Sequence, residues 1–194
     1  MKRLSILSVA ATVAALALIP STQAKAGFMV EPGVGWNFFN SESSSGAKSS
    51  ANGFGADLRA GFTFSHFAIG ASGNFSLLTS SSATAGTPAS QWLNIGAFAQ
   101  FTFPAFPLTL RAVYNFVDDL GVTVPPLPKA GAKGYGIRFG LGYKIVPKLA
   151  LNVDYVINKF TDGYLGSTTT PIPSASQDKS DNDLLITLSV PLGM

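Results

Sequence analysis

The chain has 194 residues, which predicts a single domain, and only 12% of them are charged, about half the ~25% share of an average soluble domain. Hydrophobic residues make up 46%, yet no internal stretch reaches the roughly 18 consecutive apolar residues of a membrane helix. Cysteine is absent, which excludes a disulfide framework and a thiolate metal site.

The first 26 residues have the pattern of a cleavable signal peptide. Lys2 and Arg3 form a positive region, residues 4–19 form an apolar region, and Ala24-Lys25-Ala26 supplies small residues for cleavage before Gly27. A membrane anchor helix is the alternative, which the short and interrupted apolar run disfavours. Cleavage removes three of the 13 basic residues, so ten remain against ten acidic ones. The neutral mature chain, residues 27–194, is not expected to bind nucleic acid.

The clearest structural signal in the mature chain runs from residue 53 to residue 77. Every second residue from Phe54 to Phe64 is apolar, the residues between them are small, polar or charged, and the pattern restarts at Phe67. Successive side chains of a strand point to opposite faces, so this alternation predicts two strands joined at Ser65-His66. Such strands exceed the usual soluble length of about five or six residues and match the roughly 9–11 tilted residues of a membrane barrel strand.

Eight segments of the chain show this alternation, and the connections between them are long and short in turn. Long outer loops and tight periplasmic turns are typical of outer-membrane barrels. We therefore predict an all-β fold, an eight-stranded antiparallel up-and-down transmembrane β-barrel with mobile outer loops. The predicted strands are residues 28–38, 54–64, 67–77, 92–103, 108–117, 135–145, 149–158 and 183–194. The predicted long loops are residues 39–52, 78–91, 118–134 and 159–182.

On strand number, loop asymmetry and a last strand at the C-terminal end, the mature chain resembles the small eight-stranded outer-membrane barrels of the OmpA/OmpX-like type. The resemblance implies a monomer in the bacterial outer membrane, in contact with lipid and lipopolysaccharide. It also implies recognition of the last strand by the outer-membrane assembly machinery. The expected assembly signal consists of Leu188, Val190, Leu192 and Met194, with Met194 where such barrels usually have Phe.

Charged residues stand at inward positions of the predicted strands, in a band roughly four to eight residues from the periplasmic turns. An eight-stranded barrel is just wide enough for side chains to fill it, and buried charges need partners. We therefore predict an internal ion-pair network, with inward glycines that make room for the arginines. The network residues are Glu31, Asp57, Arg59, Arg111, Arg138 and Asp154. The expected hydrogen-bonding neighbours are Asn94, Gln100, Asn115 and Asn152.

Aromatic residues gather near the predicted strand ends, where outer-membrane barrels carry interfacial girdles. The residues assigned to the girdles are Trp36, Phe38, Phe64, Phe67, Phe103, Phe116 and Tyr143.

The sequence offers little for catalysis. His66 is the only histidine and lies in a predicted periplasmic turn, away from the outer rim where lipid-modifying barrels that resemble this one have their His and Ser. We expect no enzyme activity, no cofactor and no metal centre. Asp118-Asp119 and the group Asp178, Asp181 and Asp183 are predicted at loop bases. They are interpreted as solvated charges, with a cation that bridges lipopolysaccharide phosphates as the alternative.

Three functions remain open on the sequence alone. A permanent polar plug in the lumen favours a structural role in envelope integrity. The alternatives are a narrow or gated channel for ions or small solutes, and adhesion to a cell-surface ligand through the long loops.

Overall fold

The structure, a computed structural model, describes residues 26–42, 46, 48–80, 90–122, 129–172 and 180–192. The predicted signal peptide apart from Ala26, parts of the predicted long loops, and Met194 lie outside the described residues. Within these ranges, the chain has no helix that is long and apolar enough to cross a membrane.

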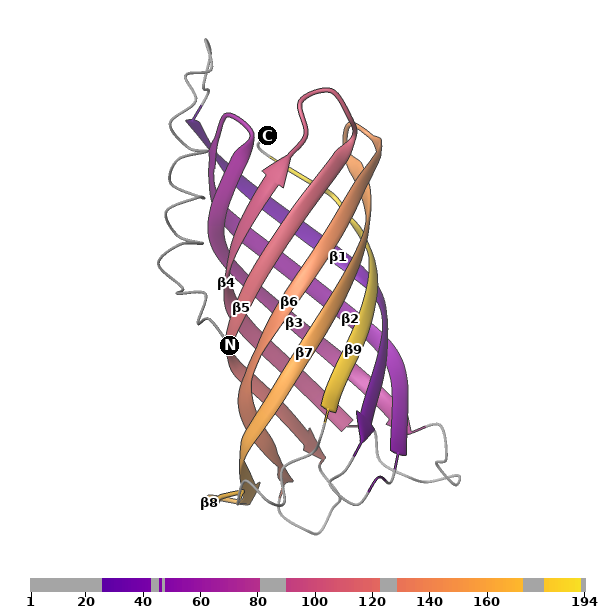
Figure 1. Ribbon diagram of the computed structural model, residues 1–194, viewed down its shortest axis with the longest axis vertical. Coiled ribbons are helices and arrows are strands. Elements are labelled where there is room, and N and C mark those ends of the chain that lie inside the picture. The colour runs from indigo at the N-terminus through magenta and orange to yellow at the C-terminus, as the bar shows by residue number, and fades with distance from the viewer. Residues whose placement is uncertain are drawn as a thin grey trace, which may run out of the picture.

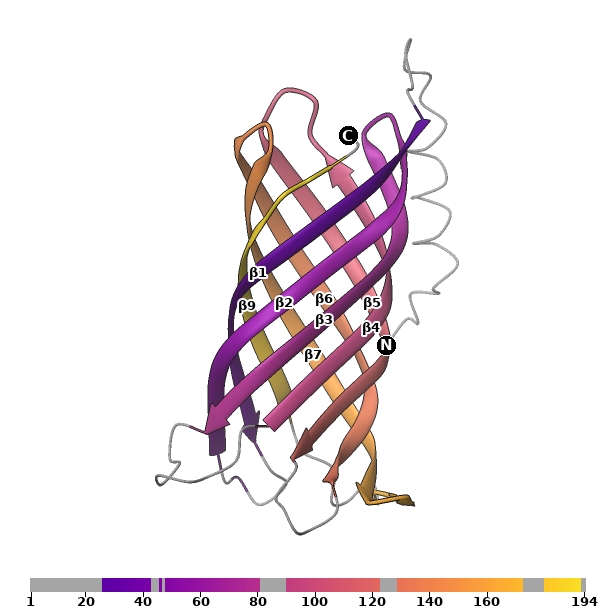
Figure 2. The same ribbon diagram turned by 180° about the vertical axis from the view of Figure 1, so that it is seen from behind.

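Eight antiparallel strands of the described chain form the wall of a closed barrel (Figures 1 and 2). Neighbouring strands pair in sequence order from β1 to β7, and β9 closes the ring because it pairs with both β7 and β1. The wall strands are β1 (Ala26–Glu42), β2 (Lys48–Phe64), β3 (Phe67–Ser80), β4 (Ser90–Thr102), β5 (Leu108–Val122), β6 (Ala130–Val146), β7 (Leu149–Leu165) and β9 (Ser180–Ser189). The short β8 (Thr168–Pro171) pairs with the end of β7.

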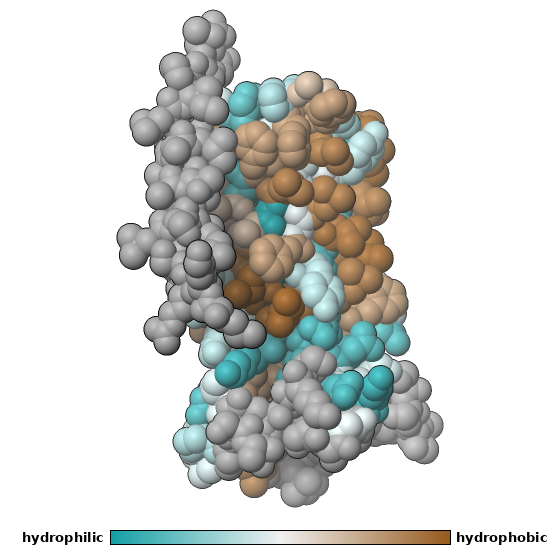
Figure 3. Space-filling model, in the orientation of Figure 1, coloured by the Kyte–Doolittle hydropathy of each residue, from teal (hydrophilic) through white to brown (hydrophobic). Residues whose placement is uncertain are grey.

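The tight connections between wall strands all lie at one end of the barrel, which is the upper end in Figure 1 and is called the turn end below, whereas the tight β7–β8 turn lies at the other end. The opposite end carries the long connections and is called the loop end. On the face seen in Figure 3, apolar residues cover much of the wall, and a hydrophilic zone follows toward the loop end. Phe62 and Leu141 are 59% and 47% exposed, whereas Arg59 and Arg138 are 1% and 2% exposed. The predicted barrel, with apolar side chains outward and charges inward, is confirmed.

The strands continue further toward the loop end than the alternation predicted. Residues 39–42 and 48–52 were expected in a loop, but β1 and β2 stay paired as far as Glu42 and Lys48. In the same way β6 and β7 stay paired as far as Ala130 and Leu165. Serine, asparagine and alanine in these extensions can face water without loss of the hydrogen-bond ladder, so the apolar pattern ends before the strand does.

A bulge in β5 changes which residues face the lumen. Asn115 pairs with Gly136, but the next pair on this ladder joins Asp118 with Gly134, so two residues of β5 stand opposite one of β6. Arg111 and Asn115 are buried before the bulge, and Asp118 is buried after it. A bulge re-aims the side chains that follow it, so Asp118 faces the lumen. β5 continues to Val122, so the prediction that strand five ends at residue 117 is wrong.

The C-terminal strand is shorter than expected. β9 ends at Ser189, and Pro191 cannot donate to a ladder. The extended pairing with β1 nevertheless continues, because the amides of Val190 and Leu192 donate to the carbonyls of Pro32 and Val30 at 2.9 and 2.8 Å.

Candidate functional site: the charged lumen

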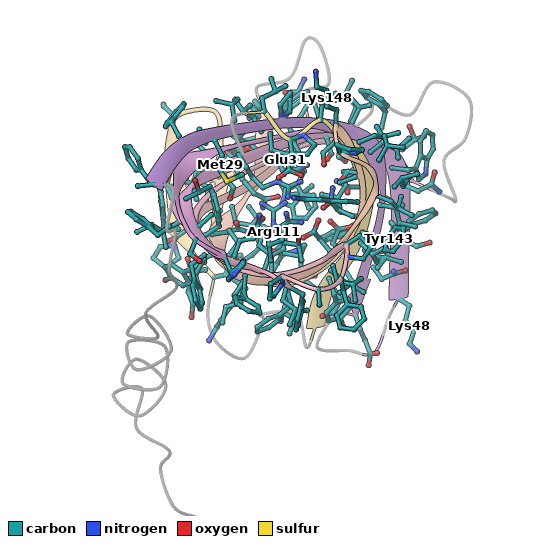
Figure 4. The ribbon with its side chains drawn as sticks, turned by 90° about the horizontal axis from the view of Figure 1, so that it is seen from above. Met29, Glu31, Lys48, Arg111, Tyr143 and Lys148 are labelled. Carbon is teal, nitrogen blue, oxygen red and sulfur yellow. The ribbon has the colours of Figure 1, made fainter. Side chains whose placement is uncertain are left out.

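The structure brings the six predicted charged residues together inside the barrel. Each is at most 5% exposed, and they come from five different strands. Figure 4 looks down the barrel from the turn end and shows Glu31 and Arg111 pointing toward its centre, whereas Tyr143 points away from it.

Arg59 and Arg138 share the carboxylate of Asp57. Arg59 donates through Nε to Asp57 Oδ2 at 2.7 Å, and its Nη1 lies 3.3 Å from Glu31 Oε1. Arg138 reaches across from β6 and donates through Nη1 to Asp57 Oδ1 at 2.9 Å and through Nη2 to the Ser72 hydroxyl at 3.3 Å. Each oxygen of Asp57 accepts from a different guanidinium group. One carboxylate therefore links β2 to β6 through the lumen.

Arg111 and Asp154 form a second unit. Arg111 Nη2 donates to both oxygens of Asp154, at 2.9 and 3.1 Å, and Nη1 donates to Gln100 Oε1 at 3.4 Å. Gly140 leaves room for this pair, because a Cβ there would lie 2.0 Å from Asp154 Oδ1 and 3.0 Å from Arg111 Nη2. Here the expected use of an inward glycine is seen directly.

Polar neighbours extend the network, although not all of the predicted ones do. Asn152 donates to the Ser189 hydroxyl at 2.8 Å, and Ser189 in turn donates to Glu31. Gln100 and Asn152 therefore join the network as expected. Asn94 and Asn115 are buried but lie closer to the loop end, opposite Asp118 and Gly136. Ser72 and Ser189 also belong to the network and were not predicted. Both stand at inward-facing positions of the alternation, which could have identified them.

The lumen is not polar throughout, which corrects the picture of a polar tube. A loop-side apolar cluster consists of Phe39, Leu78, Trp92, Val156 and Phe160, and a turn-side cluster consists of Met29, Ala68, Phe98 and Val113. On β1 the ion-paired Glu31 lies between Met29 and Phe39, whereas on β5 Arg111 lies on the turn side of Val113. Along β1, from the turn end, the inward side chains include Met29, Glu31, Asn37 and Phe39, in that order. The two-residue alternation did not predict these apolar side chains in the lumen, because Phe39 and Phe160 stand in segments expected as loops.

Toward the loop end, the lumen also contains acidic side chains that were expected as solvated loop charges. Asp118, Asp181 and Asp183 are at most 4% exposed, which overturns that expectation for these three, whereas Asp119 is half-buried and Asp178 lies outside the described residues. The Trp92 indole N–H donates to Asp118 Oδ1. The bulge in β5 and the start of β9 at Ser180 put these groups inside, since both bring residues of predicted loop bases into the wall.

A small cavity lies near the turn end of the network. Its volume is about 10 Å³, enough for roughly one water molecule. Its lining comprises Glu31, Gln100, Thr109, Gly142, Lys144, Ala150, Asn152 and Pro191. At this point the lumen has space for a water between polar groups, and not for a larger solute.

The aromatic residues assigned to the girdles lie on the outside of the wall. Trp36, Phe64 and Phe116 are 45%, 47% and 55% exposed. Phe38 and Tyr143 are also exposed, and Phe67 and Phe103 are half-buried. Near the turn end, Phe67 and Phe103 both contact Phe101, with ring centroids 4.9 and 5.0 Å apart. Phe101 is thus a girdle residue that the sequence reading omitted.

The residues of the expected assembly signal also lie on the lipid-facing side, as far as the structure describes them. Leu188, Val190 and Leu192 are 46%, 38% and 47% exposed. The fourth residue, Met194, lies outside the described part of the chain.

The chain is similar in fold to known outer-membrane proteins and in sequence to one family of them. The model of the family described as outer membrane protein beta-barrel domain matches residues 6–190. Among solved structures, Neisserial surface protein A is 18% identical, with a TM-score of 0.54 over 86% of this chain and 97% of that one. Ail, the attachment invasion locus protein of Yersinia pestis, is 9% identical, with a TM-score of 0.59 over 84% and 98%. These identities show a shared fold only. No curated protein sequence matches the chain.

Proposed function

The chain belongs to the outer-membrane β-barrel family, and from this premise we propose that it is a closed barrel with a structural role in the bacterial envelope. The family match confirms the location expected from the sequence, the bacterial outer membrane. The structural role is our inference, and it goes beyond what the family by itself implies.

One observation carries this proposal: ion pairs and two apolar clusters fill the lumen. The arginine–carboxylate contacts of 2.7 to 2.9 Å close the centre. Breaking such a pair in a buried setting costs several kcal/mol of free energy, roughly, because it leaves a charge without a partner. An ion would have to displace these contacts as well as aromatic side chains at the loop end. We therefore favour a plug over a gated channel.

A planar-bilayer recording tests the closed lumen. The purified barrel is expected to add no steady conductance above the leak, while a large general porin in the same membrane serves as the positive control. Steady single-channel steps from the barrel would reject the plug and favour the channel.

A gene deletion tests the structural role separately. Cells without the protein are expected to become more sensitive to detergents and large antibiotics, and the intact gene is expected to restore resistance. Unchanged sensitivity of the deletion strain would contradict a role in envelope integrity. Contact with lipid and lipopolysaccharide, delivery by the assembly machinery and a monomeric state belong to the same proposal.

A second candidate function is contact with a cell-surface ligand at the loop end. An open groove of about 550 Å³ lies along the β7–β8 hairpin, lined by Gly163, Tyr164, Leu165, Thr168, Thr170, Pro171 and Ile172. Tyr164 is held in place there, because its hydroxyl donates to Asp119 at 2.7 Å and Lys133 Nζ lies 5.1 Å from its ring centroid. Burial, together with this acidic partner, raises the pKa of Tyr164, so the hydroxyl stays protonated.

A cell-binding assay tests this contact surface. Substitution of Tyr164 and Leu165 by serine removes the aromatic and apolar parts of the groove. Binding that stays unchanged would remove the groove as a contact surface.

We also propose that the chain is not an enzyme. His66 lies in the turn between β2 and β3, where its ring packs edge-on against Phe101 at 6.4 Å. This position supports a structural role for the histidine in the turn-end aromatic girdle. Hydrolysis of outer-membrane phospholipid or lipopolysaccharide by the purified barrel would contradict this proposal.

A further inference from the structure

The buried charges of the lumen do not balance. Among the described residues, six buried carboxylates stand against three buried guanidinium groups. The carboxylates are Glu31, Asp57, Asp118, Asp154, Asp181 and Asp183, and the guanidinium groups are Arg59, Arg111 and Arg138. The predicted network accounts for three of each. Asp181 has an interaction of its own, so the negative charge that is left over is assigned to Asp118 and Asp183.

Described lysines near the loop end do not correct this imbalance. Lys48, Lys129, Lys133 and Lys159 are all exposed on the outside of the barrel. Arg138 attracts Asp183 from the ion-pair layer, but its two terminal nitrogens already donate to Asp57 and Ser72. Asp118 repels both Asp181 and Asp183. Buried like charges of this kind need a counter-ion or protons.

Oxygen atoms converge at one place in this acidic region. Gly136 on β6 lies between Asn115 on β5 and Asn158 on β7. A Cβ on Gly136 would lie 2.7 Å from Asn158 Oδ1 and 3.3 Å from Asp118 Oδ2. Because β6 contributes no side chain at this position, the side chains of the two flanking strands meet above it.

Several polar atoms of this acidic region lack a hydrogen-bond partner among the described residues. Asp118 Oδ2, both polar atoms of Asn158 and both carboxylate oxygens of Asp183 are buried and make no hydrogen bond to the described residues. Asn158 is 95% buried, since only 5% of it is exposed. A buried polar atom without a partner is costly, so an unseen ligand of complementary charge is the simplest account.

We propose that the loop-side half of the lumen binds one divalent cation of the calcium type through the side-chain oxygens of Asp118, Asp183 and Asn158. Calcium takes six to eight oxygen ligands from carboxylates, amides and water, roughly at 2.3–2.6 Å, and tolerates irregular geometry. No three described carboxylate or histidine side chains could hold a metal ion by themselves. The amide of Asn158 and several waters therefore complete the shell. This site lies inside the barrel, and it differs from a cation that bridges lipid phosphates outside.

Trp92 makes the proposal testable, because its indole contacts Asp118 and would lie beside the bound ion. Terbium ions replace calcium and emit light when a nearby tryptophan is excited. The chain has only one other tryptophan, the lipid-facing Trp36. The experiment uses the refolded Trp36→Phe barrel in detergent and a wavelength that only tryptophan absorbs. We expect saturable terbium emission that calcium suppresses in competition.

The test variant adds Asp118→Asn and Asp183→Asn, and the matched control adds Asp119→Asn, a neighbour that faces Tyr164 on the outer side. Emission is expected to fall at least about tenfold in the test variant, because both charged ligands are lost, and to persist in the control. The change of gel mobility on boiling verifies that each barrel is folded. A third variant, Asn158→Ala, keeps all charges and is expected to weaken terbium affinity by about tenfold, since an oxygen ligand is lost.

Three results would overturn the proposal. The first is the absence of saturable emission from the folded Trp36→Phe barrel, which would mean that the carboxylates are protonated instead. The second is emission that survives in the folded variant without Asp118 and Asp183. The third is unchanged terbium affinity in Asn158→Ala.

Discussion

Arg138 and Asp57 lie 81 residues apart in the chain, yet Arg138 Nη1 donates to Asp57 Oδ1 at 2.9 Å across the lumen. The contact joins β6 to β2, strands that are not neighbours in the wall. It is thus a cross-brace, since it links opposite parts of a ring that backbone hydrogen bonds connect only around its circumference.

The first prediction concerns this cross-brace. Substitution of Asp57 by Asn is expected to lower the free energy of unfolding by about 3–5 kcal/mol, because Arg138 and Arg59 lose their shared buried partner. Urea titration followed by the gel mobility of folded and unfolded barrel measures the loss.

The exposed pair of Lys48 and Glu42 provides the control. Its nitrogen–oxygen distance is 3.8 Å, and the side chain of Lys48 is 80% exposed. The substitution Glu42→Gln is expected to cost less than about 1 kcal/mol. Equal losses for the two substitutions would show that the lumen is hydrated enough to screen its charges.

The second prediction concerns the two tryptophans, which stand on opposite sides of the wall. Trp36 is 45% exposed and Trp92 is fully buried. In vesicles of brominated lipid, the Trp36→Phe barrel is expected to keep its fluorescence, and the Trp92→Phe barrel is expected to be strongly quenched. Quenching of Trp92 by the lipid bromines would show that the wall is inverted at this position.

The third prediction concerns a close approach of two strands. Gly70 pairs with Gly61, and a Cβ on Gly70 would lie 2.1 Å from the carbonyl oxygen of Ala60. The substitution Gly70→Ala is expected to destabilise the barrel by about 1–3 kcal/mol, because backbone must move to admit the methyl group.

Gly73 lies on the same strand and has room. Apart from its two chain neighbours, the nearest atom to a Cβ there would be the Asn94 carbonyl oxygen at 3.9 Å, so Gly73→Ala is the matched control and is expected to be tolerated. Thermal unfolding of the two variants compares them directly. A Gly70→Ala barrel as stable as Gly73→Ala would contradict the close approach.

The fourth prediction concerns the turn between β2 and β3. Ser65 has a φ of 56°, in the left-handed region, and is the only described residue other than glycine with a positive φ. That conformation costs a non-glycine residue roughly 1–2 kcal/mol, whereas glycine adopts it freely. We expect Ser65→Gly to stabilise the barrel by up to about 1 kcal/mol in the same urea titration. A loss of stability would mean that the serine side chain makes a favourable contact that outweighs the strain.

Much of this protein follows from local alternation. The period of two in residues 54–64 is enough to predict a strand, to assign Phe62 to lipid and Arg59 to the lumen, and to suggest an outer-membrane barrel. This works because the face of a side chain in a regular strand depends only on its parity. The six network residues were predictable in the same way, since a charge at an inward position of a narrow barrel needs a partner.

The alternation no longer predicts which face of the wall a side chain lies on where a strand is irregular or extends beyond the apolar zone. Asp118 lies in the lumen because a bulge in β5 reverses the alternation before it. Phe39 and Phe160 line the lumen in strand extensions whose outward residues are polar. No local pattern marks these positions. The loop-side apolar cluster and the buried acidic residues Asp118, Asp181 and Asp183 were therefore not predicted.

The amino-acid sequence alone determined the strands, their two faces and the need for buried charge pairs, because each of these depends on neighbours within a few residues. Only the closed barrel decided that Arg138 pairs with Asp57 and Arg111 with Asp154, and that Asp118 meets Asn158 above Gly136. Those contacts depend on the stagger between strands and on the order in which the ring closes, and both are properties of the whole sheet.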